Sequence, residues 1–337
     1  MGFREVTEFF REDLLKVEQC LRDNFESSLP IVTDIGDYIM NAGGKRIRPL
    51  LLLVSSRLCG MPSNDRVIKH CCVIEYIHAA TLLHDDVVDE TTVRRGNETV
   101  NAKWGSDASI LVGDYMIARA LVLLSDDIQA DIFRAFGQGS KLLVEGGLLE
   151  YSNARDILVT EEHILEVAHK KTASIMALSC QIGALLAEAG KSNEEAMVDF
   201  GNHFGIAFQL MDDAMDYDAP PEVLGKPQGT DFKEGHVTLP LLHLYQHSDK
   251  SLKREIENFI QNESLTHKEL DYVLERMRET KSLEYTMDKA RGHMAEAKKI
   301  LFSLKFPCPE YLELMVALAD HIIDRYTPSN PSLTPIS

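Results

Sequence analysis

The amino-acid sequence predicts an all-α protein. Apolar residues recur every three or four positions through most of the 337 residues, which is the spacing of one buried helical face. Alternating β-branched runs joined by hairpin turns, the pattern of strands, are almost absent. The breaks between the periodic segments are short, so no linker divides the chain and we expect a single domain.

The predicted helices follow one another along nearly the whole chain. They cover residues 6–25, 31–41, 50–59, 66–88, 108–124, 128–154, 161–189, 193–217, 239–247, 252–261, 267–282, 282–302 and 309–326. The turn NAGGKRIRP at 41–49 is glycine-rich and basic, and MPSND at 61–65 favours a turn and a helix N-cap. The main non-helical stretch is 219–235, APPEVLGKPQGTDFKEG, and long ordered loops are usually functional. We expect a helical domain over 1–326 and, from its composition, a disordered tail over 327–337.

The composition excludes several classes of partner and location. With 35 basic and 53 acidic residues the formal net charge is -18, so we expect no nucleic-acid partner. No uninterrupted apolar run reaches the roughly 18–20 residues of a membrane span. The best candidate, 175–187, is broken by Ser179 and Gln181. The charged N-terminus does not resemble a secretory signal, so we expect a cytoplasmic protein without a transmembrane segment. The six cysteines form no CxxC pair and are expected to be reduced.

Two acidic clusters lie on otherwise apolar helices. In LLHDDVVDE, Asp85 and Asp89 are four residues apart and therefore emerge from one helical face. The segment FQLMDDAMDYD repeats the DDxxD spacing. Magnesium suits such groups, because it prefers carboxylate and phosphate oxygens and is shared between one or two carboxylates and a substrate phosphate. We predict Mg²⁺ as the cofactor and a diphosphate as the ligand. The members of the two clusters are Asp85, Asp86, Asp89, Asp212, Asp213 and Asp216.

The cations that a diphosphate needs lie close to these clusters in the sequence or in glycine-rich turns. Arginine binds phosphate through two parallel hydrogen bonds, and lysine supplies a compact charge. Two polar residues precede the clusters on similar helical faces, His78 before Asp85 and Gln209 before Asp212. The candidate cations, with one neighbouring hydroxyl, are Lys45, Arg46, Arg48, Arg94, Arg95, Lys170, Lys171, Thr172 and Lys226.

These motifs resemble the trans-polyprenyl diphosphate synthases, the polyprenyl synthetase family. GGKRIRP, HAATLLHDDVVDE followed by RRG, GDYMIARA, KT, FQLMDD and GKPQGTDFKEGHVTLP occur in the family's order. The resemblance implies long antiparallel helices around a deep central cavity, usually in a homodimer. It also implies the joining of isopentenyl diphosphate to an allylic diphosphate. Metal ions and cationic side chains would stabilise the departing diphosphate, and no protein nucleophile is needed.

The resemblance assigns a role to each motif residue. Asp85 and Asp89 would bind magnesium on one wall, with Asp86 supporting them, and Asp212, with Asp213 and Asp216, would bind a further ion on the other. Isopentenyl diphosphate would be held by Lys45, Arg48, His78 and Arg95. The allylic diphosphate would be held by Arg94, Lys171, Thr172, Gln209 and Lys226, and Arg94 and Lys171 also act in catalysis. Asp231 is expected to support the second cluster. His236 stands where the family usually has lysine, and a neutral imidazole contributes less to diphosphate binding near pH 7.

Small residues before the first cluster predict a long product. Ala80 and Thr81 lie just before Asp85, where short-chain relatives carry an aromatic residue that blocks growth, and Ile77 is a moderate obstacle only. We expect an octaprenyl-like diphosphate that serves as a quinone side chain. The alternatives are a shorter-chain (farnesyl or geranylgeranyl) diphosphate synthase and a non-catalytic subunit of a heteromeric synthase. A terpene cyclase is disfavoured, because it normally lacks the second DDxxD.

Overall fold

The computed structural model describes residues 2–127, 129–220, 227–261 and 266–325. Two predictions, the role of Lys226 and the tail 327–337, lie outside these residues. The described part is almost entirely helical, so the predicted fold class is confirmed.

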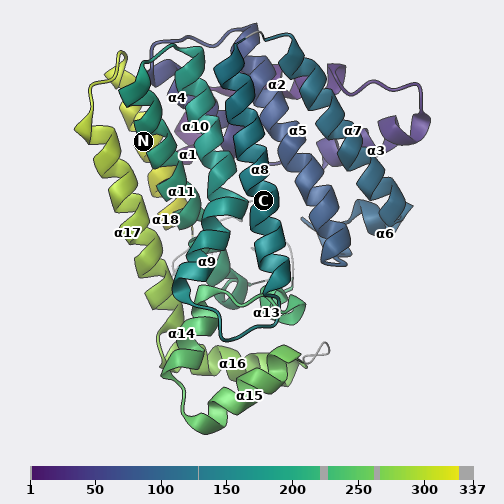
Figure 1. Ribbon diagram of the computed structural model, residues 1–337, viewed down its shortest axis with the longest axis vertical. Coiled ribbons are helices and arrows are strands. Elements are labelled where there is room, and N and C mark those ends of the chain that lie inside the picture. Colours follow the sequence, from purple (N-terminus) through teal and green to yellow (C-terminus); the bar gives the residue numbers. More distant parts are fainter. Residues whose placement is uncertain (1, 128, 221–226, 262–265, 326–337) are drawn as a thin grey trace.

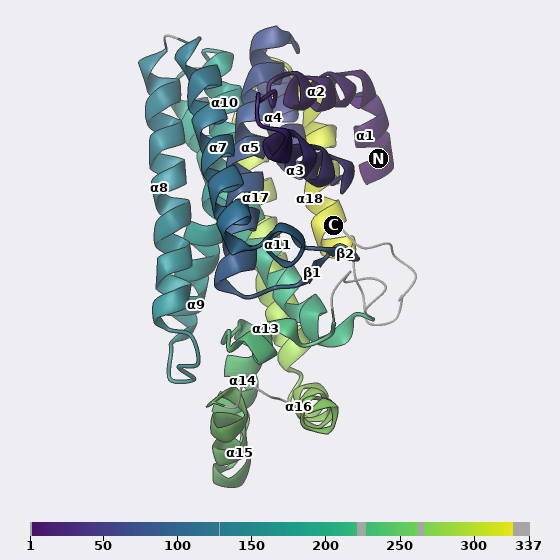
Figure 2. The ribbon, with the colours of Figure 1, turned by 90° about the vertical axis from the view of Figure 1, so that its right-hand side faces the viewer.

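The first half of the chain is almost entirely helical, and its helices are distributed around the bundle (Figures 1 and 2). Its helices are α1 (Phe3–Phe9), α2 (Arg11–Asp23), α3 (Pro30–Asn41), α4 (Ile47–Leu58), α5 (Asp65–Val88), α6 (Val100–Trp104), α7 (Ser106–Ser125) and α8 (Ala130–Ser152). A short antiparallel hairpin, β1 (Val93–Arg94) and β2 (Asn97–Glu98), follows α5. Arg95 and Gly96 form its turn, both with positive φ (54° and 74°), as a two-residue type I′ turn requires.

The second half completes the bundle and adds a lobe at one end. Its elements are α9 (Glu161–Val167), the π-helical segment η1 (Ala168–Ala173), α10 (Ser174–Leu186), α11 (Lys191–Asp218), α13 (Thr230–Glu234), α14 (Leu239–His247), α15 (Lys250–Gln261), α16 (His267–Glu279), α17 (Ser282–Ser303), the 3₁₀ turn η2 (Pro309–Tyr311) and α18 (Leu312–Asp324). Figures 1 and 2 show α15 and α16 projecting below the long helices.

The long helices pack side by side around a shared apolar core. α11 lies between α10 and α17, while α5 packs against α7 and α10 against α4 (Figure 1). The lobe has a smaller apolar cluster of its own, which includes Tyr217, Phe232, Leu241, Ile256 and Val273. This arrangement places the C-terminal end of α5 and the last turns of α11 next to the segments that carry the predicted cations.

The structure differs from the predicted elements in several places, and the hairpin β1–β2 and the short helix α6 were not predicted at all. The predicted helix 6–25 is divided at Phe10, and α13 lies inside the stretch 219–235 that was expected to be non-helical. The predicted helix 161–189 contains η1, which periodicity cannot distinguish from an α-helix. π-helical turns are rare and occur mostly at functional sites. Here η1 carries Lys171 and Thr172.

One described helix, α7, was overlooked as a candidate membrane span. By length and composition this helix could cross a membrane, and 39% of its most apolar window is buried. Sequence reasoning missed it because Asp114 and Arg119 interrupt the apolar run. A packed helix of a water-soluble protein passes the same test, so the observation alone is weak evidence for a span.

Candidate active site

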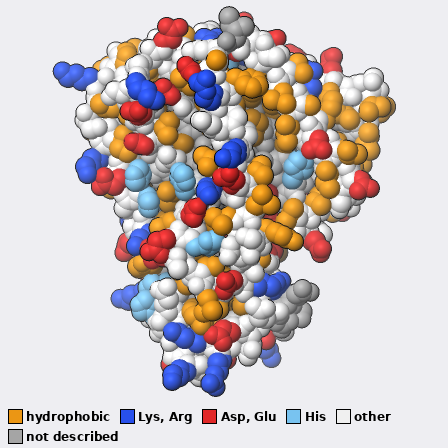
Figure 3. Space-filling model, in the orientation of Figure 1, with side chains coloured by type: hydrophobic (Ala, Val, Ile, Leu, Met, Phe, Trp, Pro, Cys, Tyr) orange, Lys and Arg blue, Asp and Glu red, His pale blue; other side chains and the backbone are white. Residues whose placement is uncertain are grey.

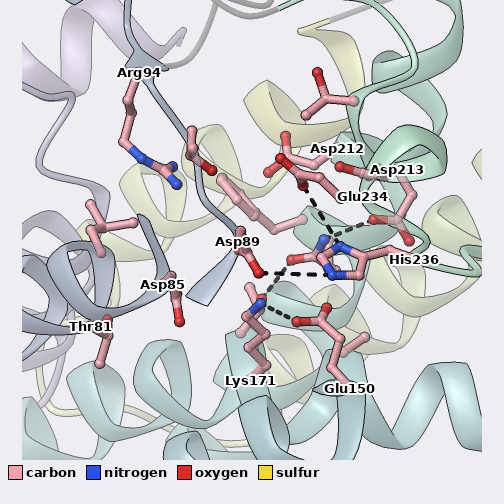
Figure 4. Close-up of a pocket in the computed structure, with 18 of the residues that line it drawn as sticks. Thr81, Asp85, Asp89, Arg94, Glu150, Lys171, Asp212, Asp213, Glu234 and His236 are labelled. Atoms are coloured by element: carbon pink, nitrogen blue, oxygen red, sulfur yellow. Dashed lines mark hydrogen bonds and ion pairs between the residues drawn. The ribbon is translucent and has the colours of Figure 1, made fainter. Parts of the chain in front are cut away.

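A cavity of about 750 Å³ lies among the C-terminal half of α5, α8, η1, α11 and the segments around the hairpin and α13. It brings together most of the predicted site residues. Figure 4 shows Asp85 and Asp89 on one side and Asp212 and Asp213 on the other. The predicted residues that line the cavity are Lys45, Arg46, Arg48, His78, Thr81, Asp85, Asp89, Arg94, Arg95, Lys171, Thr172, Gln209, Asp212, Asp213 and Asp231.

Four predicted residues lie behind the cavity wall rather than on it. Ile77 and Ala80 are buried in the core, Ala80 completely. Each residue of a helix is rotated by about 100° from the previous one, so Ala80 faces away from the side that Thr81 presents. Asp86 and Asp216 are also buried and do not line the cavity.

The two buried aspartates hold neighbouring segments in place. The carboxylate of Asp86 accepts a hydrogen bond from Nε of Arg94 at 2.7 Å, which fixes the hairpin against α5. Oδ2 of Asp216 accepts from the backbone N–H of Asp231 at 3.2 Å, which joins the end of α11 to α13. These contacts would orient residues that line the cavity.

Burial disfavours the ionised form of the carboxyl groups in the first acidic cluster. Burial raises the pKa of Asp85 and of Asp89, and the positive charge of Lys171 opposes the shift in both. Carboxylates that are removed from water and close to each other bind a divalent cation readily, because the cation replaces the lost hydration.

Lys171 is held among carboxylates. Its Nζ forms an ion pair with Glu150 of α8. Although burial acts in the opposite direction, the charges of Glu150 and Asp85 raise the pKa of Lys171, so the side chain stays protonated. Gly146 makes this placement possible, because a Cβ at that position would come within 2.4 Å of the backbone nitrogen of Lys171.

A hydrogen-bonded chain links η1 to the second cluster. Oγ1 of Thr172 donates to Oε1 of Gln209 at 2.6 Å, and Nε2 of Gln209 donates to Oδ1 of Asp213 at 2.8 Å. Burial raises the pKa of Asp213 well above its usual range. Asp212 contacts Arg325 of the C-terminal helix at 2.6 Å.

All three cations of the basic turn at 41–49 line the cavity. Arg46, with φ 51°, is tied to Glu18 at 2.5 Å and to Glu75 at 2.7 Å, so it anchors the turn. Burial and the charge of Arg325 lower the pKa of Lys45 to about 8. Burial and nearby arginines also lower the pKa of His78 well below its usual value, so its imidazole is neutral at pH 7.

Sequence reasoning missed two residues here and undervalued a third. Glu150 and Arg325 belong to no motif, and only their contacts with Lys171 and Asp212 reveal them. His236 lines the cavity, with Nε2 4.0 Å from Oδ1 of Asp89 and Nδ1 3.9 Å from Oε2 of Glu234 (Figure 4). Its place in the EGHVTLP segment was the available signal.

Known proteins are similar to this chain in sequence and in fold. The family model described as "Polyprenyl synthetase" matches residues 29–277. The chain is 36% identical over 326 residues to the octaprenyl diphosphate synthase of Haemophilus influenzae, covering 96% of this chain and 98% of that protein. It is 35% identical over 294 residues to the geranylgeranyl diphosphate synthase of Methanosarcina mazei, covering 86% and 88%. The crystal structure of a polyprenyl synthase from Caulobacter crescentus, complexed with calcium and isoprenyl diphosphate, matches with TM-score 0.92 at 33% identity, covering 97% and 98%.

A helical bundle with two carboxylate clusters and several cations around one deep cavity is the architecture of an all-α prenyltransferase. The chain belongs to the polyprenyl synthetase family. The prediction of a trans-polyprenyl diphosphate synthase is thereby confirmed at the level of the family.

Proposed function

We propose that this protein condenses isopentenyl diphosphate with an allylic diphosphate and repeats the step to give a long, octaprenyl-like all-trans chain. One observation carries the proposal. Asp85 of α5, Asp89 at the C-cap of that helix and Asp212 of α11 border the same cavity as cations from three other segments. The octaprenyl diphosphate synthase of Haemophilus influenzae, which matches almost over its whole length, supports the long product.

The donor set fits magnesium. Within the described ranges, no three His, Cys, Asp or Glu side chains already converge on one point. Each ion would therefore take one or two carboxylates and complete its shell with substrate phosphate and water, which is how Mg²⁺ is usually bound. Asp85 and Asp89 would serve one side of the diphosphate and Asp212 the other. When bound, the metal ions neutralise the diphosphate and assist its departure.

The protein's own groups position both substrates. Lys171 and Arg94 would stabilise negative charge on the departing diphosphate, and both are held in advance by a carboxylate partner. The turn of Lys45 and Arg48 would hold isopentenyl diphosphate so that its double bond faces the allylic carbon. The C–O bond of the allylic substrate breaks, the new C–C bond forms, and a proton passes to the released diphosphate.

The cavity wall supports growth beyond the first condensations. Thr81 of α5 lines it together with apolar residues of two other elements, Leu143 of α8 and Ile175 of α10. None of these three is aromatic. Phe208 also lines the cavity, but it lies one turn before Asp212 and packs on Arg325, so we infer that it leaves the growing chain room to extend between the helices. A product of this kind is suited to serve as a quinone side chain.

We also infer that two copies associate through α7 and α8. Both helices expose large apolar side chains, with Leu111 66% and Leu148 62% exposed. Figure 3 shows apolar side chains gathered over this side of the molecule. Extended apolar patches mark interaction sites, and a second copy would cover them symmetrically. This arrangement also accounts for the apolar character of α7 without a membrane, and a cytoplasmic location stays a prediction.

Product analysis tests the activity. The purified chain is incubated with isopentenyl diphosphate, Mg²⁺ and a geranyl, farnesyl or geranylgeranyl primer, and the dephosphorylated products are separated by chain length. We expect products near eight isoprene units that disappear when Mg²⁺ is chelated. Products ending at three or four units would favour the shorter-chain alternative, and no product with any primer would contradict the proposal. Sedimentation of the wild type and of Leu148→Glu tests the dimer, which the charge should weaken.

A further inference from the structure

The C-terminal helix places a fully buried arginine behind the second carboxylate cluster. Arg325 follows the last residue of α18, and its side chain is 0% exposed. Its Nη2 donates to Oδ1 of Asp212 at 2.6 Å and to the backbone oxygen of Phe208 at 2.8 Å. The guanidinium carbon lies 4.5 Å from the centroid of the Phe208 ring. Arg325 therefore binds two residues that lie one turn apart on α11, Phe208 and Asp212.

Stability alone does not explain a charge in this place. A buried ion pair is often no better than apolar packing, because both charges lose their hydration. Arg325 loses more than most, since its Nε and Nη1 have no hydrogen-bond partner among the described residues. Asp212, by contrast, is 40% exposed at its side chain and lines the cavity. The ion pair therefore links the buried guanidinium of Arg325 to the partly exposed carboxylate of Asp212, which lines the cavity.

We propose that Arg325 is a positioning residue that aims Asp212 into the cavity and offsets the repulsion among Asp212, Asp213 and Asp216, so that a divalent cation binds there. The inference rests on the proposed function, because it assumes that Asp212 is a metal ligand. Arg325 is not among the residues that line the cavity; it acts through Asp212. Groups that orient a metal ligand typically affect metal affinity by ten- to a hundredfold.

A matched control exists in another ion pair that ties α18 to a neighbouring helix. Lys298 of α17 forms an ion pair with Asp320 of α18, and it lies outside the residues that line the cavity. R325Q and K298Q each remove one positive charge that ties α18 to a neighbouring helix. A purely structural role of Arg325 predicts similar effects of the two variants on metal binding. A positioning role predicts a loss only in R325Q.

The experiment measures Mn²⁺ binding to the full chain in the presence of inorganic pyrophosphate, by electron paramagnetic resonance of free Mn²⁺. Circular dichroism establishes that each variant is folded. We expect R325Q to bind Mn²⁺ at least about tenfold more weakly, and K298Q to bind like the wild type. R325K keeps the charge and should stay within about threefold. In steady-state assays, R325Q should need more Mg²⁺ for half-maximal rate and recover much of kcat at saturating Mg²⁺.

The outcomes separate the two proposals. Unchanged Mn²⁺ affinity in folded R325Q would overturn the role of Arg325 and leave the proposed function intact. No Mn²⁺ binding by the wild type would remove the metal role on which both depend. If R325Q does not fold, R325K decides: a folded R325K with a tenfold or greater loss of affinity would show that the charge is not what positions Asp212.

Discussion

Lys171 and Glu150 form an ion pair that crosses from η1 to α8 at the cavity, and the same lysine faces Asp85 and Asp89. One cation is thus shared by three carboxylates. Its positive charge is oriented before any substrate arrives, and this preorganisation is what a group that stabilises a departing diphosphate requires.

Replacing Lys171 with Ala should lower kcat by about a hundredfold or more, because a preorganised charge at the leaving group is lost. The measurement is steady-state kinetics with saturating Mg²⁺ and a varied allylic primer. The neighbouring Lys170→Ala is the control, since Lys170 pairs with Glu166 and does not line the cavity. Equal kinetic effects of the two substitutions would argue against the assigned role of Lys171.

Replacing Asp85 with Asn should abolish most activity without lowering the melting temperature. Burial raises the pKa of Asp85, so its ionised form is disfavoured in the folded state and its removal costs the fold nothing. Activity and thermal unfolding are measured on the same preparation. Near-normal turnover in excess Mg²⁺ would remove Asp85 from the metal-binding set.

Asp212→Asn should behave differently, because it leaves the buried guanidinium of Arg325 without its counter-charge. Arg325 is fully buried whereas Asp212 is 40% exposed, so the cost arises from the uncompensated guanidinium and should reach about 3 kcal/mol. We therefore expect a clearly lower free energy of unfolding for Asp212→Asn than for Asp85→Asn, measured by urea denaturation. Equal stability of the two variants would mean that Arg325 finds another partner.

The rate should depend on the charge of Lys45 above neutral pH. Burial and Arg325 lower its pKa to about 8, so the side chain loses its positive charge as pH rises through that value. We expect kcat/KM for isopentenyl diphosphate to fall between about pH 7 and pH 9. The Lys45→Arg variant should keep its positive charge, so its kcat/KM should change little between about pH 7 and pH 9. A fall of the same size in Lys45→Arg would assign the titration to another group.

Product length should respond to position 81 rather than position 80. Thr81 lines the cavity, whereas Ala80 is completely buried in the core. Thr81→Phe should shorten the products, as judged by chromatography of the dephosphorylated chains. Ala80→Phe should instead destabilise the fold by about 1–3 kcal/mol through overpacking. A shortened product from a stable Ala80→Phe would show that the chain follows the other side of α5.

Much of this molecule was predictable from local pattern. Helical periodicity identified the bundle, and the DDxxD spacing predicted that Asp85 and Asp89 share a face that also borders the cavity. Contacts between distant segments were not predictable. Glu150 meets Lys171 across 21 positions, and Arg325 meets Asp212 only because α18 packs on α11. From the sequence alone, Glu150 and Arg325 cannot be distinguished from ordinary surface charges.

The spacing of residues in the sequence also did not predict which side chains of α5 face the cavity. A one-residue change turns a side chain by about 100°, so Thr81 and Ala80 have opposite environments although both are small residues before the same cluster. The π-helical turn at η1 had no sequence signal, since its apolar spacing continues that of the flanking helices.

The close approach at Gly146 separates two properties of the enzyme. No side chain fits at position 146 without displacing the backbone that carries Lys171. This position of α8 must therefore stay glycine if Lys171 is to keep its place. Leu143, nearly one turn earlier on the same helix, borders the cavity with its side chain. If the proposed function holds, substitutions at position 143 should change how far the hydrocarbon extends while Gly146 keeps the backbone of Lys171 in place.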